Sequence, residues 1–80
     1  MDLRCIKNKG TLWYDWKAVQ HALNNVEPCA LQLKFDQFPG ELEIQEEWMS
    51  KKSMQKFFRW YSNTCSYGQI QVVKSVLAAI

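Results

Sequence analysis

The chain has 80 residues, ten of them basic and eight acidic, with a formal net charge of +2. This length predicts one domain over residues 1–80, and the mild charge is weaker than the basic excess of a dedicated nucleic-acid binder. No run of about eighteen apolar residues is present, which excludes a membrane-spanning helix, so no membrane partner is expected.

Residues 3–14, LRCIKNKGTLWY, predict a β-hairpin. The triplet NKG places Gly10 where a type I turn with a bulge needs a positive φ. Apolar residues stand on both sides of this turn, including Ile6 before it and Leu12 after it. We therefore expect two short paired strands at the start of the chain.

Residues 15–26 predict a helix. Asp15 can accept hydrogen bonds from the free N–H groups of the first turn. Apolar residues then recur at helical spacing, as Val19 and Leu23 show, and Asn24-Asn25 with Pro28 marks the end.

Residues 30–47 alternate between apolar and polar side chains on both sides of the sequence FPG. Leu31, Leu33 and Phe35 fall on one side of such a strand, and the polar residues between them fall on the other. A period of two around Pro39-Gly40 predicts an antiparallel hairpin with one face in water.

Two further helices are predicted over about residues 50–63 and 69–80, the first of them capped by Ser50 or Ser53. The fold class is therefore α+β, with antiparallel hairpins over about residues 3–14 and 30–47 packed against two or three helices over about 15–26, 50–63 and 69–80.

The 50–63 segment combines aromatic and basic residues, and two interpretations compete for it. At about 100° per residue, Met54, Phe57 and Tyr61 line one side while Lys52 and Lys56 gather on the opposite side with Arg59. Such separation is typical of a core helix with a solvated basic back. A stacking platform for single-stranded nucleic acid would instead expose its aromatic side chains beside the basic side chains.

Motifs for catalysis or for cofactor binding are not found. The chain has no phosphate-binding glycine loop, no C-x₂₋₄-C pair for zinc, and one histidine, His21, without an obvious catalytic partner. We therefore expect a protein that is not an enzyme, with no catalytic residue, no metal site and no cofactor.

Cysteine usage bears on the compartment. The three cysteines cannot all pair within one chain, and the charged first ten residues lack the apolar run of a signal peptide. Free thiols of this kind predict a cytoplasmic protein.

Eleven aromatic residues are more than one small core is expected to bury, so some should serve a partner. The sequence thus predicts a small protein-binding module, such as an inhibitor or adaptor, of which a phage-encoded blocker of a host defence or regulatory protein is one example; a homodimer is the other form such binding could take. The candidate partner-binding residues are of types that dominate interfaces: Trp13, Tyr14, Trp48, Arg59, Trp60 and Tyr67.

The alternative is a small nucleic-acid-binding regulator. It would use the basic back of the 50–63 helix to contact phosphates. Its candidate residues are Lys51, Lys52, Lys56 and Arg59.

Overall fold

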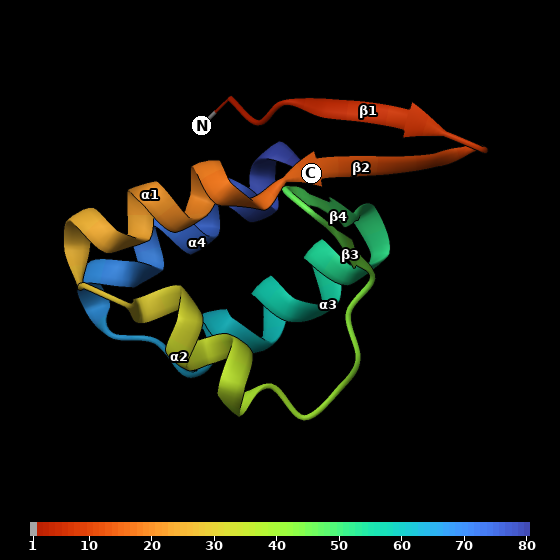
Figure 1. Ribbon diagram of the computed structural model, residues 1–80. Helices are drawn as coiled ribbons and strands as arrows, with labels where there is room; N and C mark the ends of the chain where they lie inside the picture. The colour runs from red at the N-terminus through yellow and green to blue at the C-terminus, as the bar shows by residue number, and fades with distance from the viewer. Residues whose placement is uncertain (1) are drawn as a thin grey trace.

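A computed structural model describes residues 2–80 and shows two hairpins and four helices (Figure 1). The elements in chain order are β1 (Cys5–Asn8), β2 (Thr11–Asp15), α1 (Trp16–Val26), α2 (Ala30–Gln37), β3 (Ile44–Gln45), β4 (Trp48–Ser50), α3 (Lys51–Ser62) and α4 (Tyr67–Ala79). The α+β class predicted from the sequence is confirmed.

The four strands form one antiparallel sheet in the order β1-β2-β4-β3. The first predicted hairpin is confirmed, but its turn is tighter than expected. Asn8 pairs directly with Thr11, and the two residues between them, Lys9 and Gly10, both have positive φ, 52° and 79°. These values are those of a two-residue type I′ loop, whose twist matches that of the strands without a bulge.

Each central strand leads directly into a helix. Asp15 ends β2 and caps α1, its carboxylate accepting a hydrogen bond from the Lys17 backbone N–H at 3.0 Å. Ser50 ends β4 and caps α3 by accepting from the Ser53 backbone N–H. Because β2 and β4 are neighbours in the sheet, both caps anchor their helices to its centre.

The hairpin predicted over residues 30–47 is wrong. Residues 30–37 form helix α2, and the second hairpin lies further on, with a turn at Glu46-Glu47 and no strand at Pro39-Gly40. The sequence of α2, ALQLKFDQ, contains no β-branched residue and is rich in good helix formers. In a segment of this length, an alternating pattern does not distinguish a strand from a helix. The helix propensity of its residues therefore decides the structure.

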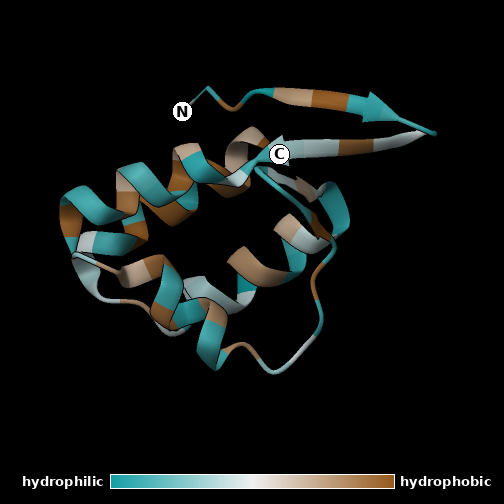
Figure 2. Ribbon diagram, viewed as in Figure 1, coloured by the Kyte–Doolittle hydropathy of each residue, from teal (hydrophilic) through white to brown (hydrophobic). Residues whose placement is uncertain are grey.

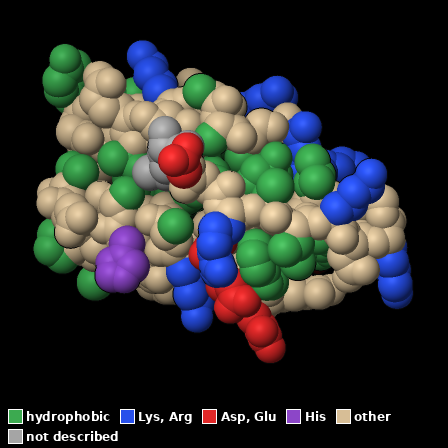
Figure 3. All heavy atoms as spheres, turned by 90° about the horizontal axis from the view of Figure 1, so that it is seen from above, with side chains coloured by type: hydrophobic (Ala, Val, Ile, Leu, Met, Phe, Trp, Pro, Cys, Tyr) green, Lys and Arg blue, Asp and Glu red, His purple; other side chains and the backbone are tan. Residues whose placement is uncertain are grey.

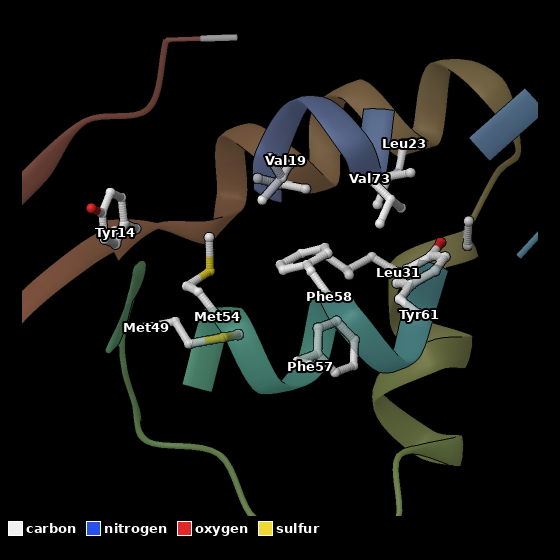
Figure 4. Packing of buried hydrophobic residues seen from close by; sticks show 12 residues of the cluster. Tyr14, Val19, Leu23, Leu31, Met49, Met54, Phe57, Phe58, Tyr61 and Val73 are labelled. Atoms are coloured by element: carbon white, nitrogen blue, oxygen red, sulfur yellow. The ribbon is translucent and has the colours of Figure 1, made fainter. Parts of the chain in front are cut away.

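Helix α3 lies across the core, which confirms its interpretation as a core helix with a basic back. Phe57, Phe58 and Tyr61 are fully buried, whereas Lys56 and Arg59 on the other side are exposed. Figure 4 shows Phe58 between α3 and the side chains of α1 and α4. In Figure 2 the helices carry hydrophilic and hydrophobic residues together, as helices with one buried face do.

Phe57 is the centre of an aromatic cluster. Five other rings have centroids 4.9 to 5.9 Å from its own, and they come from α2, the loop after it and α3 itself: Phe35, Phe38, Phe58, Trp60 and Tyr61. The predicted carboxy-terminal helix is also confirmed, since Val73 and Val76 of α4 close the core from the other side.

Candidate functional site

A cleft of about 250 Å³ opens at the end of the molecule opposite the β1–β2 hairpin. Its walls come from the residue after α1, from α2, from the α3–α4 loop and from the first turn of α4. Figure 1 shows these four segments meeting at one end of the helical layer. Segments far apart in sequence are thus brought together by the way α1 and α4 pack side by side.

One exposed apolar side chain lines this cleft, and two others belong to residues next to lining residues in the chain. Tyr67 is 86% exposed, Leu33 51% and Val26 45%. Leu33 lines the cleft itself, and Val26 packs against α4 beside Tyr67, since a Cβ on Gly68 would lie 3.1 Å from Val26 Cγ1. We call Val26, Leu33 and Tyr67 the apolar rim. Exposed apolar side chains gathered near one hollow are typical of a binding surface.

Lys34 supplies a positive charge to one wall of the cleft. Its Nζ donates hydrogen bonds to the backbone oxygen and the hydroxyl of Thr64, at 2.7 and 3.0 Å. The same ammonium group lies 5.6 Å from the Trp60 ring and 5.4 Å from the Tyr61 ring. Within residues 2–80 it forms no salt bridge. Lys34 therefore fixes the end of α3 through hydrogen bonds and cation–π contacts, and it shares the cleft with the Glu27 carboxylate without forming an ion pair with it.

A hydrogen-bond chain runs from the core to the cleft through Gln69. The Tyr61 hydroxyl donates to Gln69 Oε1 at 2.7 Å, and Gln69 Nε2 donates to the Glu27 carboxylate. Burial, and then the nearby Cys65 and Glu27, raise the pKa of Tyr61 to about 12. Burial also raises the pKa of the Cys65 thiol. At neutral pH the Cys65 thiol in the cleft and the buried Tyr61 phenol behind it are therefore protonated, and neither is an activated nucleophile.

The predicted partner-binding residues do not form one surface. Tyr67 belongs to the apolar rim, and Trp60 is half-buried behind Lys34. Tyr14 is 6% exposed and lies in the core, so it has little surface to offer a partner. Arg59 is exposed on α3 but makes none of the cleft walls.

Trp13 and Trp48 lie together on the other face of the sheet. Trp13 pairs with Ser50 and Asp15 pairs with Trp48, so the two indoles project on the same side, away from Tyr14 and Met49. The Arg4 guanidinium stands 5.3 Å from the Trp48 ring. Arg4 also holds Asp15 through a salt bridge of 2.8 Å. These side chains form a second surface, separate from the cleft.

The residues of the nucleic-acid alternative share their surroundings with acids. Lys52 and Lys56 line a shallow hollow of about 270 Å³, and Glu41 and Glu43 line it with them. Lys51 is half-buried beside the sheet. A phosphate approaching this part of α3 would therefore meet carboxylates as well as ammonium groups.

The sequence did not single out Val26, Leu33, Lys34 or Cys65 as site residues. Leu33 and Lys34 fall in the hairpin predicted over residues 30–47, and Val26 falls in the helix predicted over residues 15–26. The signal that could have found them is the shortness of the α1–α2 connection, three residues from Glu27 to Cys29, which places α2 beside the end of α1.

None of the helices in residues 2–80 is long and apolar enough to cross a membrane. Over the same residues, His, Cys, Asp and Glu side chains form no group of three that could hold a metal ion. Comparison of the chain with known protein families, with curated proteins and with solved structures finds no match.

Proposed function

We propose that this protein is a non-enzymatic protein-binding domain and that its partner docks on the apolar rim around the cleft. The observation that carries the proposal is the exposure of Leu33 in the cleft and of Tyr67 and Val26 next to residues that line it. A tyrosine that is 86% exposed gains a large contact area when a partner covers it, at a small cost in side-chain entropy.

The chemistry of the cleft supports binding over catalysis. The raised pKa values of Tyr61 and Cys65 leave both groups protonated, and Lys34 is held by two hydrogen bonds to Thr64. Its ammonium group forms no ion pair within residues 2–80 and suits a partner that presents a carboxylate or a backbone carbonyl near its own apolar anchor. The polar groups then orient the partner, and the rim supplies most of the contact area.

The small size of the domain suits an inhibitor or an adaptor. A phage-encoded blocker of a host defence or regulatory protein is one example of such a protein. Three unpaired cysteines fit a reducing cytoplasm, which we propose as its compartment. A nucleic-acid regulator is the weaker alternative, because Glu41 and Glu43 share the hollow of Lys52 and Lys56.

The test is capture of partners by the folded protein and by two variants. Leu33→Ala/Tyr67→Ala removes most of the rim from exposed positions, so the fold should survive. Ile44→Ala is the matched control, since Ile44 is 39% exposed on β3 and lies outside the cleft. If the two rim residues are hot spots, their truncation should cost about 2 kcal/mol or more of binding free energy, so the double variant should bind its partner about thirtyfold more weakly.

Photo-crosslinking locates the contact. A photoreactive amino acid at position 67 should give a crosslinked product with the captured protein, and the same group at position 44 should not. Equal capture by the rim variant and the wild type, or crosslinking from position 44 alone, would show that the rim is not the docking site. Loss of capture by nuclease treatment would favour the nucleic-acid alternative.

A further inference from the structure

A second surface lies at the opposite end of the molecule, where the β1–β2 hairpin projects from the body (Figure 1). All four residues of β1, Cys5–Asn8, are exposed, and β1 pairs with β2 on one side alone. We propose that the free edge of β1 adds a strand from a partner protein, and that this strand is an extended segment in which acidic and apolar residues alternate.

The register shows which backbone groups are free. The Asp15 N–H donates to the Arg4 oxygen at 3.0 Å, and the two-residue loop closes on the Asn8–Thr11 pair. In an antiparallel ladder, hydrogen-bonded pairs alternate with pairs that are not bonded. The backbone N–H and C=O groups of Ile6 therefore point toward β2, whereas those of Cys5 and Lys7 point outward. Two donors and two acceptors are thus available to an added strand.

The charge of the hairpin selects the kind of strand. Arg4, Lys7 and Lys9 lie on it or next to it, and of these only Arg4 forms a salt bridge within residues 2–80. Seen from above, lysine and arginine side chains gather toward the end where the hairpin projects (Figure 3). An acidic side chain placed beside Lys7 would compensate its charge. Ile6, 43% exposed on the side of Trp13, would then contact an apolar neighbour.

A second copy of this chain is a poor occupant of the same edge. Pairing β1 with another β1 would bring the basic residues of both hairpins together, and like charges across strands are destabilising. Edge lysines commonly prevent sheet edges from pairing with copies of themselves. Lys7 thus disfavours self-association and favours an acidic partner through the same charge.

Three blocked synthetic peptides test this inference with the full chain. One alternates Glu and Val, the second alternates Lys and Val, and the third is the Glu/Val peptide with every amide N-methylated, because alternate methylation would leave one edge of the strand able to pair. Amide hydrogen exchange is followed by NMR. The Glu/Val peptide should slow exchange at Cys5 and Lys7 and leave Ile6, already bonded to β2, unchanged. Equal protection by the Lys/Val or the N-methylated peptide, or no protection at Cys5 and Lys7, would overturn the proposal.

Variants separate charge from hydrogen bonding. Lys7→Glu should reverse the preference, so that the Lys/Val peptide binds better than the Glu/Val peptide; an unchanged preference would refute the charge argument. Cys5→Pro removes an outward N–H and no bond to β2, and it should weaken binding about fivefold relative to Cys5→Ala, the factor of one typical hydrogen bond. If Cys5→Pro disturbs the hairpin, the N-methylated peptide alone decides the point.

The inference is independent of the proposed docking site at the cleft. The Leu33→Ala/Tyr67→Ala variant should bind the Glu/Val peptide as well as the wild type does. Loss of peptide binding in that variant would show that the peptide occupies the cleft and would overturn the strand-addition proposal. Failure of the peptides with partner capture intact would leave the cleft proposal standing by itself.

Discussion

The aromatic cluster around Phe57 tests the core of this fold in a single substitution. Phe57→Ala should lower the free energy of unfolding toward the upper end of the range of about 3–5 kcal/mol for such truncations. The reason is that the side chain is fully buried and that five neighbouring rings each lose a partner at 4.9 to 5.9 Å. A domain of this length has about 4–12 kcal/mol in total, so this loss is a large share of its stability and unfolds the domain if the total lies at the lower end of that range.

Urea denaturation followed by circular dichroism measures the effect. If the m-value is about 1 kcal/mol per M, each kcal/mol lost lowers the midpoint by about 1 M. Phe57→Leu keeps part of the ring's volume and should cost about 1–3 kcal/mol, which leaves a transition that can be measured. Lys56→Ala is the matched control, because Lys56 is exposed on the opposite face of α3 and should change stability by less than about 0.5 kcal/mol.

The assignment of the buried and exposed faces of α3 can be refuted by measuring the stability and the partner binding of the same variants. If Phe57→Ala unfolds at nearly the wild-type midpoint and loses partner binding, the aromatic side of α3 is a binding surface and the described core is wrong. If Lys56→Ala is as destabilising as Phe57→Ala, the two faces of α3 have been assigned the wrong way round. A variant that changes the m-value would instead point to an altered unfolded state.

Three further predictions follow from single contacts. The unfolding free energy should fall as pH rises from about 10 toward 12, because the pKa of Tyr61 is 10.0 ordinarily and about 12 in the fold; Tyr61→Phe should reduce this loss in a pH series of denaturation curves, and the smaller part that begins above pH 9 should remain because the pKa of Cys65 is also raised. Asp15→Ala should cost about 1–2 kcal/mol by removing the cap of α1, and Asp15→Asn should cost less because its amide oxygen can still accept. Reductant should leave the melting temperature unchanged, and Cys65 should be the slowest cysteine to alkylate, as mass spectrometry of labelled peptides would show.

The sequence carried enough information to predict the elements whose signals agree with one another. Asp15 marked the start of α1, and the segregation of aromatic from basic residues marked the buried side of α3. In both cases the cap and the hydrophobic period point to the same element, so tertiary packing reinforces the local preference. The first hairpin was predictable because Gly10 adopts a positive φ without steric cost whatever the turn type, whereas the positive φ of Lys9 has no signal in its residue type.

The positions of surface sites were less predictable, because they depend on how the elements pack. Residue type selected Tyr67, which is exposed, but the same reasoning selected Tyr14, which β4 and the helices bury. Composition can show that some aromatic surface must remain outside a small core. Which residues remain outside depends on contacts between distant segments, and a pattern along the chain does not contain those contacts.

The error at α2 and the hidden cleft have one physical cause. In the strand predicted for residues 30–37, Leu31, Leu33 and Phe35 would all face the core. In the observed helix each residue turns about 100°, so Leu33 points about 200° away from Leu31, while Phe35 returns toward it. Leu31 is accordingly fully buried, Phe35 packs on Phe57, and Leu33 is 51% exposed at the cleft. The choice of helix over strand thus moves one leucine from the core to the rim, and the proposed docking surface exists because of it.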